Sequence, residues 1–195
     1  MVVSDQDDLA LAVHRQEHGA FDRLVERFEC ALFRYVQRLL QNDHDAQEVV
    51  QDAFVRAHRA LTAQYGNEKV RTLQLRPWLF RIARNLSYNR RRGKGLKLEQ
   101  PLDTAREDQF QPHTRPVLIT RELEEREEKA QLDRAIALLP TESRDLILLR
   151  FVEEMSYAEI SRTTGFNEAS LRGKVFRSLK LLRDALGVKG VSHAV

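Results

Sequence analysis

The 195-residue sequence predicts an all-α fold of two small helical domains joined by a flexible linker. Apolar residues recur at spacings of three and four in several stretches, which is typical of helices with one buried face. No stretch of useful length alternates as a strand would. Residues 93–120 carry glycines and prolines with little periodicity, as linkers do. The predicted parts are a first domain (1–95), a linker (96–120), a second domain (121–187) and a C-terminal tail (188–195).

The first domain is predicted to contain four helices. Asp43 is a suitable N-cap for the third helix, and Pro77 suits the first turn of the fourth. Gly66 and Asn67 lie between these two helices and predict a loop there. The expected ranges are about 5–17, 20–41, 44–63 and 77–92.

The second domain is predicted to be a four-helix domain as well. Its first helix stops at Pro140, and Thr141 can cap the next. Ser156 and Glu159 have the spacing of a capping box at the start of the third helix, and Asn167 is a suitable cap for the fourth. The expected ranges are about 121–139, 142–153, 157–164 and 168–186.

Residues 157–177 have the layout of a DNA-binding helix-turn-helix: a short helix, a turn at Gly165 and a longer helix. Apolar residues from both helices can bury the corner between them. Polar and basic residues share the opposite face of the second helix, where Arg and Lys can contact guanine edges or phosphates. These candidates are Ser170, Arg172, Gly173, Lys174 and Arg177. The alternative is a plain helical hairpin with a basic solvent face.

The formal net charge of +3 conceals an uneven distribution. Residues 71–97 hold nine basic side chains and no acid, and residues 172–183 hold five basic side chains and no acid. An acidic run separates these two segments. Two basic segments in a nearly neutral chain predict contact with a polyanion, although basic residues can also simply solvate a helix face.

The predicted helix that starts at Pro77 has two distinct faces. Trp78 and other apolar residues recur on one face and are expected in the core. The other face combines groups that can hold phosphates, hydrogen-bond base edges and stack on an unpaired base. Its members are Arg81, Arg84, Asn85, Tyr88 and Arg92. The alternative is that the arginine stems only cover apolar surface.

Other features exclude several classes of protein. The single cysteine, Cys30, rules out an internal disulfide and predicts a small buried apolar residue among Phe28, Leu32 and Phe33. His14 and His18 have metal-ligand spacing but no evident third ligand, so we expect no metal and no cofactor. The sequence shows no membrane-spanning stretch, no signal-peptide pattern and no catalytic motif, and an enzyme is not expected.

Several sequence blocks occur in a characteristic order. The first domain holds residues 21–40, 45–57 (DAQEVVQDAFVRA) and 76–85 (RPWLFRIARN). The second holds residues 135–140 (AIALLP), 145–150 (DLILLR) and 155–160 (MSYAEI). Together they resemble, over nearly the whole chain, a bacterial RNA polymerase sigma factor of the extracytoplasmic-function type.

The resemblance implies three binding surfaces. The third helix would bind the clamp helices of the polymerase β′ subunit through Asp45, Glu48, Gln51, Asp52 and Val55, although its acids could be ordinary surface charges. The helix after Pro77 would contact the −10 promoter element through Arg81, Arg84, Asn85, Tyr88 and Arg92. The last helix would contact the −35 element through Ser170, Arg172, Gly173, Lys174 and Arg177. Residues 65–75 would hold a flipped base, and this loop departs from the family pattern.

The resemblance also implies partners. They are core RNA polymerase (β′ clamp helices and β flap), promoter DNA and an anti-sigma factor, which is often membrane-tethered. The chain would then be cytoplasmic in a bacterium, held at the inner membrane where its anti-sigma factor is tethered there, and would respond to stress or extracytoplasmic signals. Two alternatives are a stand-alone regulator that binds DNA through residues 141–187 and a helical adaptor that imitates a sigma factor.

Overall fold

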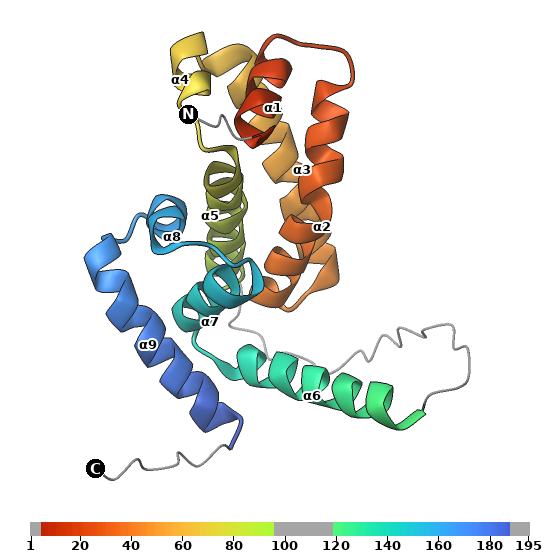
Figure 1. Cartoon of the computed structure of the whole chain (residues 1–195), viewed down its shortest axis with the longest axis vertical. Helices are drawn as coiled ribbons and strands as arrows, with labels where there is room; N and C mark the ends of the chain where they lie inside the picture. Colours follow the sequence, from red (N-terminus) through yellow and green to blue (C-terminus); the bar gives the residue numbers. More distant parts are fainter. Residues whose placement is uncertain (1–4, 96–118, 188–195) are drawn as a thin grey trace.

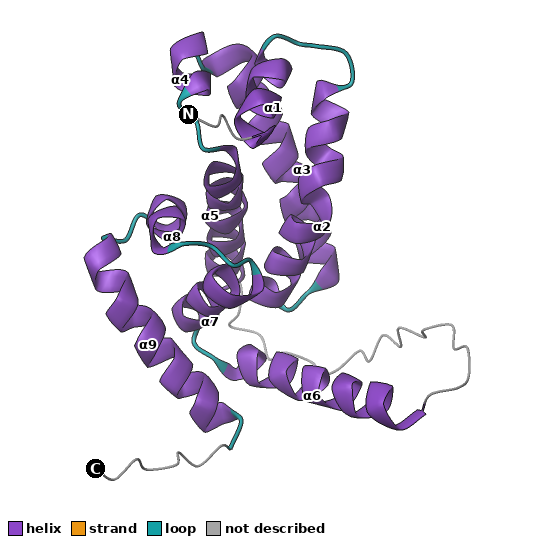
Figure 2. Cartoon of the chain, in the orientation of Figure 1, coloured by secondary structure: helices purple, strands orange, loops and turns teal. Residues whose placement is uncertain are grey.

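The computed structural model describes residues 5–95 and 119–187, and every regular element in those ranges is helical (Figure 2). This confirms the predicted all-α fold class. The two ranges form an N-terminal bundle (residues 5–95) and a C-terminal bundle (residues 119–187). Residues 96–118 of the predicted linker, and the predicted tail at 188–195, lie outside the described residues.

The N-terminal bundle is built around three long helices, which Figure 1 shows side by side. Helices α2, α3 and α5 pack against one another, and α1 packs against α2 and the short helix α4. The bounds are α1 (Asp5–His14), α2 (Ala20–Leu40), α3 (Asp43–Arg59), a π-helical turn η1 (Ala60–Gln64), α4 (Asn67–Arg71) and α5 (Leu75–Gly95). The buried residues of α2 recur at spacings of three and four, as predicted: Leu24, Phe28, Leu32, Tyr35, Val36 and Leu39.

Two details of this bundle differ from the expectation. Asn42, not Asp43, caps α3: its extended backbone lets its side chain accept a 2.8 Å hydrogen bond from the Asp45 amide. The predicted loop contains the short helix α4, and α5 begins at Leu75, two residues before Pro77. Proline is tolerated there because the first amides of a helix have no intrahelical partner.

The C-terminal bundle contains α6 (Ile119–Leu138), α7 (Thr141–Ile147), a π-helical turn η2 (Leu148–Val152), α8 (Tyr157–Thr164) and α9 (Glu168–Ala185). Ser156 and Glu159 form the predicted capping box, and the Asn167 side chain caps α9. Gly165 ends α8 with a positive φ of 79°, a conformation that glycine adopts without strain. Helices α8 and α9 therefore form the predicted helix-turn-helix.

The two bundles share one apolar core. Helix α8 packs against α5, and α7 and η2 pack against α2 (Figure 1). Four consecutive residues, Leu146, Ile147, Leu148 and Leu149, are almost completely buried and belong to that core. In the described arrangement, the C-terminal bundle therefore covers one side of the N-terminal bundle.

Candidate nucleic-acid interface

The five candidate residues on α5 do not share one environment. Arg84 and Tyr88 face the C-terminal bundle and are partly buried, whereas Arg81, Asn85 and Arg92 are exposed. Residues 84 and 85 lie about 100° apart around a helix, so one can be covered while its neighbour is open. The sequence placed all five on one row, and the structure divides that row.

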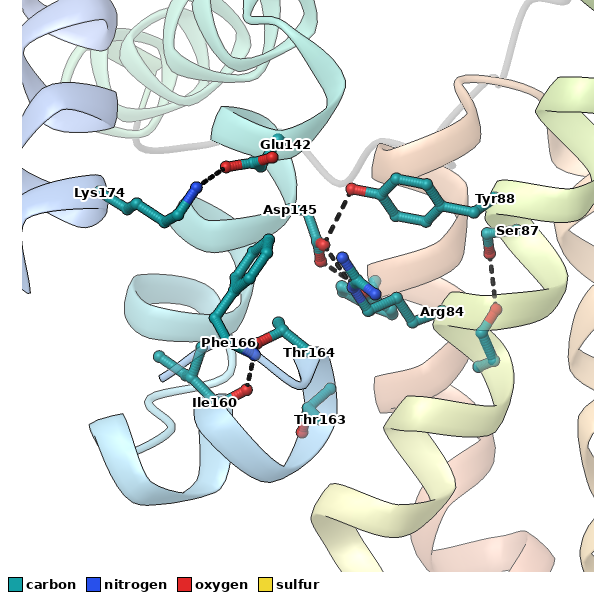
Figure 3. Close-up of polar contacts among 12 residues, drawn as sticks. Arg84, Ser87, Tyr88, Glu142, Asp145, Ile160, Thr163, Thr164, Phe166 and Lys174 are labelled. Carbon is teal, nitrogen blue, oxygen red and sulfur yellow. Dashed lines mark hydrogen bonds and ion pairs between the residues drawn. The ribbon is translucent and has the colours of Figure 1, made fainter. Parts of the chain in front are cut away.

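Arg84 and Tyr88 meet the carboxylate of Asp145, which is fully buried on α7 (Figure 3). The Arg84 guanidinium donates to Asp145 Oδ2 at 2.6 Å, and the Tyr88 hydroxyl donates to the same oxygen at 3.1 Å. Tyr35, buried on α2, donates to Oδ1 at 2.7 Å. Three donors from the N-terminal bundle thus converge on one carboxylate of the C-terminal bundle.

Burial dominates the electrostatics of this cluster. It raises the pKa of the Asp145 carboxyl above its ordinary value, although the Arg84 guanidinium and the two tyrosine hydroxyls oppose that shift. Burial also raises the pKa of the Tyr88 and Tyr35 hydroxyls, and the neighbouring Asp145 charge adds to this effect. Both tyrosines therefore remain hydrogen-bond donors at neutral pH.

Asn85 lies on another side of α5, where it lines a pocket of about 470 Å³ between α3, η1 and α5. Tyr65 and Trp78 form an aromatic wall, with ring centroids 5.9 Å apart and the indole N–H 3.3 Å from the tyrosine hydroxyl. Two arginines of α3, Arg56 and Arg59, line the other side. Trp78 was expected in the core, and it lies half-buried at this pocket.

Arg56 and Arg59 are further candidates that were not predicted from the sequence. Both are exposed, and they lie three residues apart at the end of α3, just before the loop that was expected to hold a base. That spacing on an exposed helix face was the available signal. Aromatic rings, two guanidinium groups and an amide around one pocket suit a flipped base and its flanking phosphates.

The predicted polymerase-binding residues of α3 also divide into two groups. Asp45 is buried, with its carboxylate 3.0 Å from Arg90 of α5, and Glu48 pairs with the same arginine. These contacts tie α3 to α5 within the bundle. The remaining three candidates, Gln51, Asp52 and Val55, are exposed, and Val55 presents half of its surface to solvent.

The candidate residues of α9 lie mostly on an open surface. Ser170, Arg172, Gly173 and Arg177 are exposed, and Lys174 is half-buried, donating to Glu142 of α7 at 2.6 Å. Among the described residues, a Cβ on Gly173 would meet only the Arg177 guanidinium, at an ordinary 3.5 Å, so none of these neighbours requires glycine there. The α9 face is thus available to a partner in the described arrangement.

Three further observations concern Cys30, metal binding and membrane-spanning helices. Cys30 was predicted to be buried and is exposed, because it lies two residues from both Phe28 and Leu32 on α2 and so faces away from them. Within the described residues, no group of three or more His, Cys, Asp or Glu could hold a metal ion. Among the described helices, none is long and apolar enough to cross a membrane.

Comparisons with known proteins identify the family of the chain. The family models "Sigma-70 region 2" and "Sigma-70, region 4" match residues 24–96 and 129–182. The RNA polymerase sigma-H factor of Pseudomonas aeruginosa is 29% identical over 95% of this chain and 96% of its own length. The ECF RNA polymerase sigma factor SigE of Mycolicibacterium smegmatis is 31% identical over 86% of this chain and 62% of its own length.

Solved structures show the same fold. CnrH, in a complex with the cytosolic domain of CnrY, matches with a TM-score of 0.67 and 24% identity over 95% of this chain and 99% of that one. The sigma factor RpoE of Bartonella quintana, in a complex with the anti-sigma factor NepR, matches with a TM-score of 0.66 and 19% identity. The match covers 88% of this chain and 99% of that one. With both sigma-70 regions present in order on a matching fold, the chain belongs to the extracytoplasmic-function sigma factors of bacterial RNA polymerase.

Proposed function

We propose that this chain directs RNA polymerase core enzyme to promoters, with the α5 pocket contacting the −10 element and α9 contacting the −35 element. The pocket at Asn85 carries the proposal most directly. Its aromatic wall offers a stacking surface for an unpaired base, and the Asn85 amide can hydrogen-bond a base edge. Extruding a base costs a few kcal/mol, which stacking can offset.

The open face of α9 supports the second half of the proposal. Ser170, Arg172 and Arg177 are exposed on the second helix of a helix-turn-helix, where such helices enter the major groove. Arginine pairs bidentately with guanine or holds phosphates. Lys174 is less exposed than these three residues, because its ammonium group donates to Glu142.

The proposal includes two protein partners. Core polymerase would bind the exposed part of α3 at Gln51, Asp52 and Val55 through its β′ clamp helices, and the β flap would bind the C-terminal bundle. An anti-sigma factor would bind the chain and hold it inactive; the complex of the sigma factor RpoE with the anti-sigma factor NepR, which has a similar fold, supports such a partner. The chain would act in the bacterial cytoplasm or, while bound to a membrane-tethered partner, at the inner membrane.

Transcription with purified components tests the proposal. Core polymerase, this chain and a library of promoter-like duplexes should give products that start at defined sites, and sequencing those products gives the promoter. Absence of promoter-specific product under any condition would contradict the proposal. Nanomolar duplex binding without polymerase would instead favour a stand-alone regulator, and failure to bind either core or DNA would favour an adaptor.

Asn85→Ala provides a sharper test of the pocket. The variant should change the preferred −10 sequence, with about 1–3 kcal/mol lost at the contacted base, while binding to core polymerase stays unchanged. Asn89→Ala is the matched control, because Asn89 is exposed on the same helix and does not line the pocket. Loss of core binding in Asn85→Ala would contradict this assignment of the α5 face.

A further inference from the structure

Two of the proposed −10 contacts are already occupied within the chain. Arg84 and Tyr88 both bind Asp145, and α8 lies against α5 (Figure 3). We propose that Asp145 is an internal substitute for promoter DNA, so that the described arrangement is an autoinhibited state. This inference rests on the proposed function, because it assigns a regulatory role to the same α5 surface.

The chemistry of the cluster fits such a substitution. A carboxylate offers charged oxygen acceptors to a guanidinium and a phenol, as a phosphate does. All three hydrogen bonds recorded to the Asp145 carboxylate within the described residues come from the N-terminal bundle. Opening the interface would free Arg84 and Tyr88 to exchange this carboxylate for DNA.

The energetics allow the exchange. A buried ion pair gains Coulomb energy but loses the hydration of both charges, so its net contribution to stability is often small. Asp145 is fully buried and Arg84 keeps only 12% of its side-chain surface exposed, so both pay this cost in the closed arrangement. DNA offers Arg84 an equivalent partner while Asp145 returns to water.

Further contacts around the cluster hold the bundles together. Arg76 of α5 contacts Glu153 and lies 3.9 Å from Glu159 of α8. Thr163 of α8 donates to the Pro77 carbonyl at 3.2 Å, and Arg144 of α7 donates to the Leu39 carbonyl at 3.1 Å. These contacts keep α7 and α8 over the Arg84 and Tyr88 face of α5.

Other binding surfaces stay open in the same arrangement. The α9 face, the pocket at Asn85 and the exposed part of α3 are not covered by the contacts that surround Asp145. Polymerase could therefore bind α3 before the bundles separate. Autoinhibition would block only the −10 contacts of Arg84 and Tyr88, and separation of the bundles would make these contacts possible.

The test uses the full-length chain with Asp145→Asn, which removes the charge and keeps the shape. Spin labels at Glu26→Cys of α2 and Lys180→Cys of α9, in a Cys30→Ser background, report the distance between the bundles. Both label sites are exposed. Asp22→Asn, at an exposed position of α2, removes the same charge from the surface and is the control.

We expect one narrow distance distribution for the unmodified chain and for Asp22→Asn, and a broader, longer distribution for Asp145→Asn. Fluorescence anisotropy with short single-stranded DNA of mixed sequence, at fixed salt, should show about tenfold tighter binding by Asp145→Asn, equivalent to the loss of about 1.4 kcal/mol of competing interaction. Equal distances and equal DNA affinity in all three proteins would overturn the proposal.

Two additions keep the test decisive. If Asp145→Asn unfolds, Tyr35→Phe removes one hydroxyl from the same cluster without touching the DNA-facing residues, and should give the same changes at a few-fold smaller scale. Unchanged distances and affinity in Tyr35→Phe would then overturn the proposal. A parallel transcription assay with core polymerase separates the two claims. If the unmodified chain gives a specific product but neither variant changes the distance or the DNA affinity, autoinhibition alone is contradicted. If no specific product forms, the proposed function is contradicted.

Discussion

The two DNA-binding candidates of this sigma factor, α5 and α9, carry similar side chains in different surroundings. The candidates of α9 lie mostly on an open face, whereas Arg84 and Tyr88 of α5 are held by a buried carboxylate from the other bundle. The same residue type therefore has different surroundings: Arg177 of α9 is exposed, whereas Arg84 of α5 holds the two bundles together through Asp145. The comparison places the proposed control of promoter contact on α5, where Arg84 and Tyr88 meet Asp145.

The largest expected effect comes from Arg84→Ala, which leaves Asp145 buried without its guanidinium. Removing one partner of a buried pair costs about 3–5 kcal/mol, so the free energy of unfolding should fall by about 3 kcal/mol in urea titrations. Arg81→Ala is the matched control, since Arg81 is exposed one turn away on the same helix and should change stability by less than about 0.5 kcal/mol. Equal losses in the two variants would remove the distinction between the covered and open sides of α5.

Arg177→Ala should weaken promoter binding and leave stability unchanged, in contrast to the loss of stability expected for Arg84→Ala. At promoters with the preferred −35 sequence, the free energy of promoter binding should weaken by about 1–3 kcal/mol, because a base contact is lost. The free energy of unfolding should stay the same. Transcription from promoters that differ only in the −35 element measures this loss. Arg183→Ala, exposed further along α9, is the control. A stability loss in Arg177→Ala as large as in Arg84→Ala would show that α9 is not the open helix described here.

Glu153→Gln should have the smallest effect and should depend on pH. Glu153 lies at the interface with one buried carboxylate oxygen that has no hydrogen-bond partner among the described residues. Burial raises its pKa even though Arg76, Arg34 and Arg38 lower it. An acid whose pKa is higher in the folded state binds more protons there than when unfolded, so the free energy of unfolding falls as pH rises from the unfolded pKa through the folded one.

At neutral pH, Glu153→Gln should therefore raise the unfolding free energy by about 1 kcal/mol or less, since the charge no longer has to be buried. The decrease in stability between acid and neutral pH should also be shallower than in the unmodified chain. Urea titrations at several pH values measure both quantities. A variant that is less stable at neutral pH would show that the pair with Arg76 outweighs the cost of burial.

Local patterns predicted most of the fold. Helix ranges followed from apolar spacing, and Ser156, Glu159 and Asn167 cap the helices where their types and positions indicated. The prediction that Thr141 caps the next helix was wrong, because Thr141 is the first residue of α7 and Pro140 precedes it. The cap of α3 was wrong by one residue because Asn42 and Asp43 are both good caps, and only the backbone conformation distinguishes them. Short helices such as α4 depend on tertiary contacts and leave a weak local signal.

The candidate site was predicted less completely. Asp145 looked like part of an ordinary helix, and nothing near it in the sequence indicates that Tyr35, 110 residues away, binds it. Contacts between bundles depend on how two complete surfaces fit, which no periodicity encodes. The same reason explains why Asp45 and Glu48 were assigned to polymerase binding with no sign that Arg90 pairs with both.

A double-mutant cycle between Arg84 and Asp145 tests the central claim most directly. The unfolding free energies of the unmodified full-length chain, Arg84→Ala, Asp145→Ala and the double variant give the energy with which the two side chains interact. If the bundles are packed together in the free protein, we expect a coupling energy between Arg84 and Asp145 of about 2 kcal/mol or more, in the range of directly contacting pairs. A coupling near zero would mean that these side chains do not meet in the free protein, and would contradict the closed arrangement.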